Sequence, residues 1–395
     1  MSDVARWLFG LSVALVAYAY AGYPALLWLL AALRRRRAAP ADDRDWPLVS
    51  FSLPAYNEEA SIAATLERLL EVDYPSDRRE ILVISDASTD RTDEIVRGFA
   101  TRGVELLRMP ERRGKTAAEN AARERLRGGI VVNTDASVHV HRNGLKPLIR
   151  QFADPAVGLA SGRDVSVTRM EGDVNVGESG YVGYEMWVRD LETRVGSIVG
   201  ASGCFYAIRK SLHMAPVPEA LSRDFAAALV THEHGFRAVS VSDAVCFVPR
   251  IGSIRREYRR KVRTMTRGLG TLWFKRHLMN PLRHGLFAWS LLSHKLVRWL
   301  VPWALVAASI ALVFLAPHEA WATLGLGAGL LVLALAAVGW WWPEGRPAPR
   351  FAAVCAYFVS GMLAAIVAWT KALSGEAHPV WEPTRREGSG APRPG

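Results

Sequence analysis

The stretch LVSFSLPAYNEE (residues 48–59) decides the fold, because an apolar run of strand length leads directly into a polar turn. We predict a buried strand over residues 48–53. Two further apolar runs end in the same way: residues 80–85 before DASTD (86–90), and residues 130–133 before DAS (135–137). Ligands of open α/β sheets bind beyond the carboxyl ends of the strands, so we expect the functional site at these turns.

Helical patterns separate the predicted strands. They cover residues 58–70, 90–100 and 116–126, and residues 104–107 are expected to be extended. Strands that alternate with helices predict right-handed crossovers and a parallel sheet, which places the chain in the α/β class.

The 395 residues are half apolar, and four stretches carry no charge: residues 7–33, 299–316, 320–343 and 351–370. A helix needs about 17–25 apolar residues to cross a bilayer core, so all four are predicted spans and a wholly soluble protein is excluded. Three cysteines are too few for a disulfide scaffold. A net charge of +11 suits an anionic membrane surface or phosphate-bearing ligands.

The first apolar stretch is too long for the core of a signal peptide and precedes RRRR (34–37), so we interpret it as a retained anchor. Arginines directly after the helix predict that this side faces the cytoplasm. Four crossings would then leave the basic tail (Lys371, Arg385, Arg386) outside, which its charge does not favour. A re-entrant late helix, or a partial crossing by residues 286–292, would change the parity, and the sequence leaves this open.

The expected domains follow from these boundaries. We predict an anchor with its basic stop (1–37), a cytoplasmic α/β domain (38–253), basic interfacial helices (254–295), three transmembrane helices (296–373) and a flexible tail (374–395).

Several common catalytic motifs are absent from the sequence. No GxGxxG follows the first strand, and GKT (114–116) lacks the earlier glycine of a Walker A loop. HExxH, CxxC and GxSxG do not occur either. The remaining set is carboxylates at strand ends with scattered basic residues, which suits a nucleotide diphosphate and a hydroxyl nucleophile.

Four side chains carry this chemistry, and three of them have an alternative interpretation. Asp86 can accept hydrogen bonds from a base or sugar, or can belong to a turn whose Asp90 caps the next helix. Lys115 can meet a diphosphate or be a solvated lysine. Asp135 follows a Val/Ile strand and needs a partner, which a divalent cation with diphosphate oxygens would supply. Asp224, before an apolar helix, can serve in the site or as an N-cap.

The segment 254–267 carries seven basic residues against the single acid Glu257. We discount nucleic acid as a partner, because the segment precedes a membrane span and has one aromatic residue, Tyr258, for stacking. An interfacial helix on anionic lipid explains most of these charges. One or two of them can instead neutralise a departing diphosphate.

Taken together and in order, these elements resemble the membrane-bound glycosyltransferases of family 2, a group related to synthases of polysaccharide and poly-N-acetylglucosamine. The resemblance covers nearly the whole chain. It rests on an ordered set of runs: LPAYNEE (53–59), VISDASTD (83–90), RGKTAAEN (113–120), NTDAS (133–137), residues 200–209, SRD (222–224) and GFR (235–237).

The resemblance implies a GT-A fold, the Rossmann-like nucleotide-diphospho-sugar transferase fold, and a nucleotide-sugar donor, usually a UDP-sugar. Asp224 would be the general base for the acceptor hydroxyl in a single inverting displacement. Asp135 would be the first acid of the DxD motif and a ligand of Mg²⁺ or Mn²⁺. The donor contacts would be Pro54, Ala55, Tyr56, Glu58, Asp86, Lys115 and Asp135.

Three motifs depart from the family pattern. Ser137 stands where the second carboxylate of DxD is usual, which weakens the expected dependence on a cation. Arg223 replaces the usual Glu before the base. The Gln-x-x-Arg-Trp motif of processive synthases reads RKVRT (260–264): Arg260 and Arg263 are expected on the diphosphate or acceptor side, and the missing Trp puts processive synthesis in doubt.

The sequence therefore predicts a multi-pass enzyme of the inner membrane with a cytoplasmic catalytic domain. It would transfer a sugar to a glycan or lipid-linked acceptor, for polysaccharide or glycolipid synthesis. An oligomer or an export partner stays open. A non-catalytic scaffold that binds nucleotide or a partner synthase is the alternative, supported by Ser137 and Thr264. Uncharged spans offer no polar path, which argues against a transporter.

Overall fold

The structure is a computed structural model, and it describes residues 2–34, 45–167, 176–249, 253–343, 346 and 348–376. The start of the predicted α/β domain (residues 38–44), most of the predicted tail (377–395), and Arg35, Arg36 and Arg37 of the basic stop lie outside the described residues. The chain forms two compact units. We call them the helical unit (Met1–Leu30, Ile251–Leu269 and Met279–Glu376) and the sheet unit, built from Ala31–Arg250 and Gly270–Leu278.

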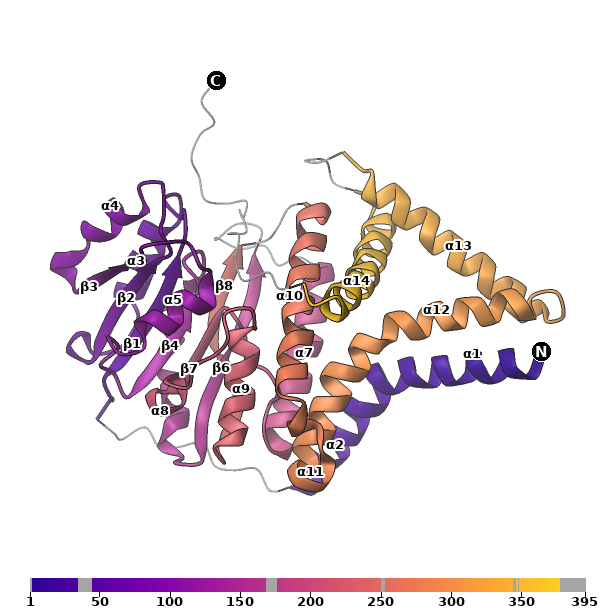
Figure 1. Ribbon diagram of the computed structural model, residues 1–395, viewed down its shortest axis with the longest axis horizontal. Coiled ribbons are helices and arrows are strands. Elements are labelled where there is room, and N and C mark those ends of the chain that lie inside the picture. The colour runs from indigo at the N-terminus through magenta and orange to yellow at the C-terminus, as the bar shows by residue number, and fades with distance from the viewer. Residues whose placement is uncertain are drawn as a thin grey trace. The chain divides into compact units, whose positions relative to one another are not determined.

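The sheet unit contains an eight-stranded sheet in the order β3-β2-β1-β4-β7-β6-β8-β5 (Figure 1). The strands are β1 (Val49–Ala55), β2 (Arg79–Ser85), β3 (Val104–Arg108), β4 (Ile130–Thr134), β5 (His139–Val140), β6 (Val157–Val167), β7 (Phe205–Arg209) and β8 (Arg237–Pro249). β1 is parallel to β2 and β4, and β2 is parallel to β3. β7 is antiparallel to β4 and β6, so the complete sheet is mixed.

Helices cover both faces of this sheet, because alternate strand residues point to opposite sides. In β2, Ile81 and Val83 belong to one buried cluster, and Leu82 and Ile84 to the other. The first cluster includes residues of α3 (Ile62–Leu70), α4 (Thr92–Arg97) and α6 (Leu145–Arg150). The second includes residues of α5 (Lys115–Ala122), α8 (Lys210–His213) and α9 (Arg223–Glu233). α7 (Val176–Val195) packs against β8.

The predicted alternation of strands and helices over residues 48–133 is confirmed, with two informative differences. The first helix begins at Ile62 instead of residue 58, because Asn57 has a φ of 52° and starts a turn. Glu58 lies outside any helix, and its backbone N–H donates to the hydroxyl of Thr92 at 2.8 Å. The antiparallel strands beyond residue 133 were not part of the prediction.

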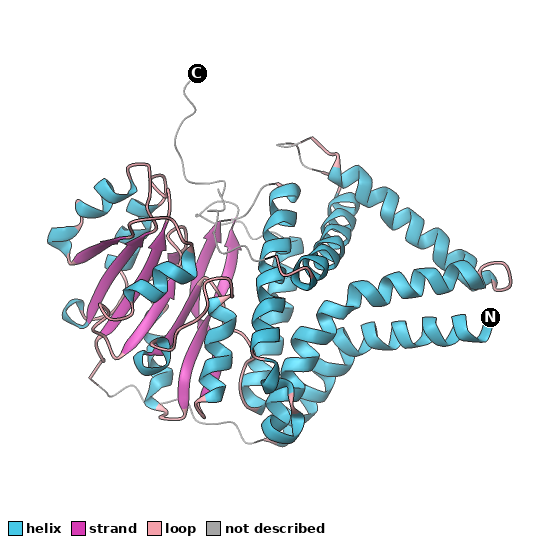
Figure 2. Cartoon of the chain, viewed as in Figure 1, coloured by secondary structure: helices cyan, strands magenta, loops and turns pink. Residues whose placement is uncertain are grey.

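The helical unit holds most of the long apolar helices. Its described regular elements are helices, which Figure 2 draws in cyan. Its elements are α1 (Ser2–Ala17), the π-helical turn η1 (Tyr18–Gly22), α2 (Tyr23–Leu33, which continues into the sheet unit), α10 (Ile254–Phe274, which also continues there), α11 (Pro281–Leu291), the π-helical segment η6 (Leu292–Val297), α12 (Arg298–Leu315), α13 (Ala320–Trp340) and α14 (Arg350–Leu373). Short 3₁₀ turns are η2 (Ser76–Arg78), η3 (Ala100–Arg102), η4 (Gln151–Ala153) and η5 (Arg276–Met279).

Four helices among the described residues are long and apolar enough to cross a membrane: Ser2–Leu33, Pro281–Leu315, Ala320–Trp340 and Arg350–Leu373. The apolar run 286–292 belongs to the second of these helices and is not a separate segment. Within the unit, Arg6 pairs with Glu319 at 2.6 Å. The Tyr18 hydroxyl lies 2.7 Å from Ser293 Oγ and accepts a bond from Trp289 Nε1 at 2.9 Å.

Candidate active site

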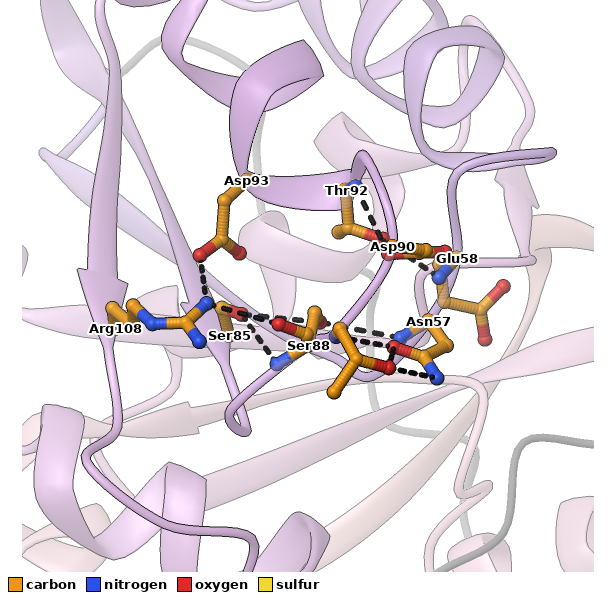
Figure 3. A network of polar contacts seen from close by, with 9 residues as sticks. Asn57, Glu58, Ser85, Ser88, Asp90, Thr92, Asp93 and Arg108 are labelled. Atoms are coloured by element: carbon orange, nitrogen blue, oxygen red, sulfur yellow. Dashed lines mark hydrogen bonds and ion pairs between the residues drawn. The ribbon is translucent and has the colours of Figure 1, made fainter.

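The turns after β1 and β2 are joined by a polar network (Figure 3). Asn57 accepts from the Thr89 backbone N–H at 2.8 Å and its own N–H donates to Ser88 Oγ at 3.2 Å. Asp90 accepts from the N–H of Glu59 at 3.1 Å and from the N–H of Thr92 at 3.0 Å. These side chains fix both turns to each other. Asp90 accepts from the N–H of Thr92, the first residue of α4, but the N-cap position of this helix is Arg91, so Asp90 is not its N-cap residue.

The first of the residues predicted to contact the nucleotide-sugar donor lie at this edge of the sheet. Pro54 and Ala55 are the last residues of β1 and pair with Ile84 and Ser85 of β2. The Tyr56 ring carries the Arg112 guanidinium 3.8 Å from its centroid, a cation–π contact that the sequence did not reveal. Glu58 accepts from the Ser61 hydroxyl at 2.6 Å.

Asp86 anchors the turn that leads into α5. It is 2% exposed, and its two oxygens accept from the backbone N–H groups of Arg113 (2.8 Å) and Gly114 (2.7 Å). Gly114 has a φ of 95°, a left-handed conformation that glycine adopts without steric cost. A carboxylate offers about four lone-pair sites, so two backbone bonds leave acceptor capacity for a ligand. Next to it, Ala87 has a φ of 57°, which is strained for alanine.

Lys115, the first residue of α5, bridges two parts of the site. Its Nζ donates to Asp135 Oδ1 and, at 3.1 Å, to the carbonyl of Gly203. Burial opposes the charged form, but the attraction of Asp135 and Glu119 outweighs it and raises the pKa of Lys115. The ammonium is therefore charged at neutral pH and lies beside the carboxylate of Asp135, the residue that follows β4. The solvated-lysine interpretation is wrong, because the side chain is 19% exposed and paired.

Asp224 completes this cluster from α9. It lies in the first turn of the helix and not at the N-cap, which is Ser222, so the N-cap interpretation is wrong. The Ser222 hydroxyl donates to Asp224 Oδ1. A Cβ atom on Gly203 would stand 2.8 Å from Asp224 Oδ2, so the carboxylate packs directly against the Gly203 backbone. Lys115 and Asp224 thus both lie against Gly203, and Lys115 links this glycine to Asp135.

Sequence reasoning missed two residues of this cluster. Gly203 lies in the run 200–209 and Glu119 in the run 113–120, both of which carried the resemblance, but neither was given a role. No periodicity distinguishes Gly203 from the other glycines of that run. Glu119 looks like an ordinary helical surface acid in sequence, yet it is completely buried.

Arg260 and Arg263 belong to α10, in the part of that helix assigned to the helical unit. Arg260 forms a bidentate pair with Glu257, one turn earlier, at 2.8 and 2.7 Å. Their role toward a diphosphate or acceptor stays a prediction.

The donor set fits a cation that arrives with its substrate. Among the described residues no three His, Cys, Asp or Glu side chains gather as a metal site. Asp135 is 17% exposed and one of its oxygens is engaged by Lys115, which leaves one carboxylate oxygen. Mg²⁺ commonly takes one or two carboxylates and completes its shell with substrate phosphates and water, so a single carboxylate oxygen is compatible with a cation of this kind.

A cavity of about 330 Å³ lies elsewhere in the sheet unit, lined in part by Trp46, Ile130 and Arg209. Ile130 begins β4, so the cavity lies at the end of that strand opposite to Asp135. The carboxylate cluster, not the cavity, carries the groups suited to chemistry.

Comparisons with known proteins agree with this geometry. Residues 50–213 match the family model "Glycosyl transferase family 2". The glycosyltransferase AglE of Haloferax volcanii is 32% identical over 118 residues, which cover 29% of this chain and 39% of that protein. The β-monoglucosyldiacylglycerol synthase of Synechocystis sp. is 32% identical over 143 residues, covering 33% of this chain and 30% of the synthase. The chain therefore spans less than half of the length of both relatives.

A solved structure extends the likeness to most of the chain. The mannosyltransferase PcManGT from Pyrobaculum calidifontis, in complex with GDP-Man and Mn²⁺, superposes with a TM-score of 0.69 at 26% identity. The match covers 93% of this chain and 99% of that one. The strand-end carboxylates, the family model and this shared architecture lead to one conclusion: residues 50–213 match glycosyl transferase family 2, and the sheet unit has the GT-A fold.

Proposed function

We propose that this protein is an inverting glycosyltransferase that moves a sugar from a nucleotide-sugar donor, a UDP-sugar by the family resemblance, to a glycan or lipid-linked acceptor at a membrane. The observation that carries the proposal is that Lys115 and Asp224 both lie against Gly203 at the carboxyl edge of the sheet, and that Lys115 links this glycine to Asp135. It combines a charged amine and two carboxylates within one partly buried cluster.

The donor would lie along the strand ends. The turn residues Pro54 to Glu58 and Asp86 would contact base and ribose, since they follow β1 and β2. Lys115 would face the diphosphate, because a buried ammonium at a helix start is well placed for an anion. Arg260 and Arg263 would add positive charge on the diphosphate or acceptor side.

The chemical step would be one in-line displacement. The acceptor oxygen bonds to the anomeric carbon, the bond from that carbon to the diphosphate oxygen breaks, and the hydroxyl proton passes to the Asp224 carboxylate. Lys115 stabilises the negative charge that collects on the departing diphosphate. Asp135, with Ser137 beside it, would hold Mg²⁺ or Mn²⁺, and that cation would supply further charge neutralisation at the leaving group.

For the cell, we propose that the four apolar helices insert into the inner membrane and that residues 38–253 form a cytoplasmic catalytic domain. The basic face of α10 would then rest on anionic lipid. Products would enter a polysaccharide or a glycolipid.

A donor screen tests the proposed activity. Full-length protein purified in detergent is incubated with several UDP-sugars and with GDP-mannose, with and without Mn²⁺ or Mg²⁺, and release of nucleoside diphosphate is measured after addition of membrane lipid extract as acceptor. We expect release with one donor, and a dependence on cation that reports how far Ser137 weakens the metal site. Nucleotide binding without release under any of these conditions favours the scaffold alternative.

Replacement of Asp135 tests the donor side. We expect Asp135→Ala to weaken binding of the nucleoside diphosphate with Mn²⁺ by about tenfold or more, since the carboxylate is lost and Lys115 is no longer held by it. Isothermal titration calorimetry measures the change. Asp73→Ala, at an acid that is 51% exposed and pairs with Lys146, is the matched control. Unchanged affinity in Asp135→Ala would place the diphosphate elsewhere.

A further inference from the structure

A buried ion pair lies behind the Lys115–Asp135–Asp224 cluster. Glu119 Oε2, on α5, is 3.4 Å from Arg223 Nε, on α9, and the two side chains are 0% and 4% exposed. Within the described part of the chain, neither Glu119 oxygen accepts a hydrogen bond. A buried pair of this kind is costly to desolvate, and apolar side chains of similar volume would often serve the fold equally well. The pair therefore calls for a role beyond packing.

Among the groups around Arg223, Glu119 is the acid that pairs with it. Burial lowers the pKa of His213 well below its usual value, and Arg223 and Arg123 lower it further, so this imidazole is neutral. Burial raises the pKa of Glu119; the attraction of Lys115 and Arg223 opposes that rise without cancelling it, and the nearby Asp135 and Asp224 add to it. Glu119 thus faces two cations, one of them a residue of the catalytic cluster.

Arg223 is held at several points. It donates to Asn120 Oδ1 through Nη1 and to the His213 carbonyl, at 2.9 Å, through Nη2. The preceding residue, Ser222, is fixed as well, because its backbone N–H donates to Thr271 Oγ1 at 3.0 Å. The first turn of α9, which carries Asp224, is therefore held by the bonds of Ser222 and Arg223.

We propose that Glu119 and Arg223 are positioning residues for sugar transfer, whose ion pair holds the first turn of α9 so that the Asp224 carboxylate stays against Gly203. The inference rests on the proposed function, in which Asp224 is the base. It also explains a departure in the sequence: Arg223 stands where the family resemblance leads one to expect Glu, and Glu119 supplies the compensating negative charge from α5. Displacement of a reacting group by about 1 Å can cost about 100-fold in rate, so a clamp here has a large effect.

A double-mutant cycle on the full-length enzyme tests this role. Glu119→Gln, Arg223→Gln and the double variant are compared by kcat, by KM for the donor, and by calorimetric affinity for the nucleoside diphosphate. We expect each single variant to lower kcat about tenfold or more, with KM and affinity within about twofold of wild type. The double variant is expected to be no slower than the slower single variant, because both substitutions break the same interaction.

The control is Glu67→Gln, at an exposed carboxylate that pairs with Arg102 at 2.6 Å and is 45% exposed. It should leave kcat unchanged. The double variant leaves neither charge of the pair buried without its partner. Its kcat can therefore still be compared with wild type if a single variant folds poorly. A lower melting temperature with wild-type kcat in both singles, or rate losses that multiply in the double, would overturn the positioning role. A wild-type protein without turnover would instead remove the proposed function itself.

Discussion

Asp224→Asn is expected to abolish sugar transfer while the protein still binds its nucleotide donor. General base catalysis contributes about 10²–10⁴-fold, and an amide in place of the carboxylate cannot take the acceptor proton. The substitution keeps the size of the side chain and an oxygen that can accept from Ser222, so the turn should remain in place. Steady-state kcat and calorimetric donor affinity, measured on the same preparation, separate the two effects.

Asp77→Asn is the matched control for this substitution, because the Asp77 side chain is 78% exposed and contacts only its neighbour Arg78 among the ion pairs of the described residues. It should retain wild-type turnover. Full turnover by Asp224→Asn would remove Asp224 as the base.

Gly203→Ala is expected to lower kcat by a comparable factor, because it displaces the Asp224 carboxylate instead of removing it. The added methyl would stand 2.8 Å from Asp224 Oδ2 and 3.5 Å from its Cγ, so the carboxylate must move. The same residue's carbonyl accepts from Lys115, which couples the shift to the diphosphate side. We expect kcat to fall about 100-fold, the cost of about 1 Å of misplacement.

The control for this change is Gly196→Ala, where a Cβ meets nothing within 4 Å. A Gly203→Ala/Asp224→Asn double variant adds a sharper check: if the methyl acts by displacing Asp224, the double variant should be no slower than Asp224→Asn alone. Wild-type kcat in Gly203→Ala would show that the position of Asp224 tolerates this shift.

The sequence was sufficient to predict the parallel strands at the start of the sheet. Residues 48–53, 80–85 and 130–133 are nearly continuous apolar runs followed by polar turns, and they form β1, β2 and β4 in adjacent, parallel positions. Since parallel strands present their carboxyl ends at one edge of the sheet, the sequence predicts that Asp86 and Asp135 lie at the same edge.

The remainder depends on contacts between distant segments. Asp224 joins Lys115 only because the antiparallel strand β7 brings Gly203 beside β4, and no periodic signal indicates that pairing. Glu119 could not be recognised as buried from a helix whose other residues are short and mixed in character. The turn at Asn57 shortened the first helix through side-chain bonds to the next turn, which are also non-local.

The most direct test of the account is transfer of a radiolabelled sugar from the donor found in the screen to membrane lipid extract, with wild-type protein and Asp224→Asn side by side. The account predicts label in the glycan or lipid fraction with wild type, formed together with nucleoside diphosphate, and none above background with the variant. Equal labelling by both proteins, or nucleotide binding without label by the wild type, would contradict it.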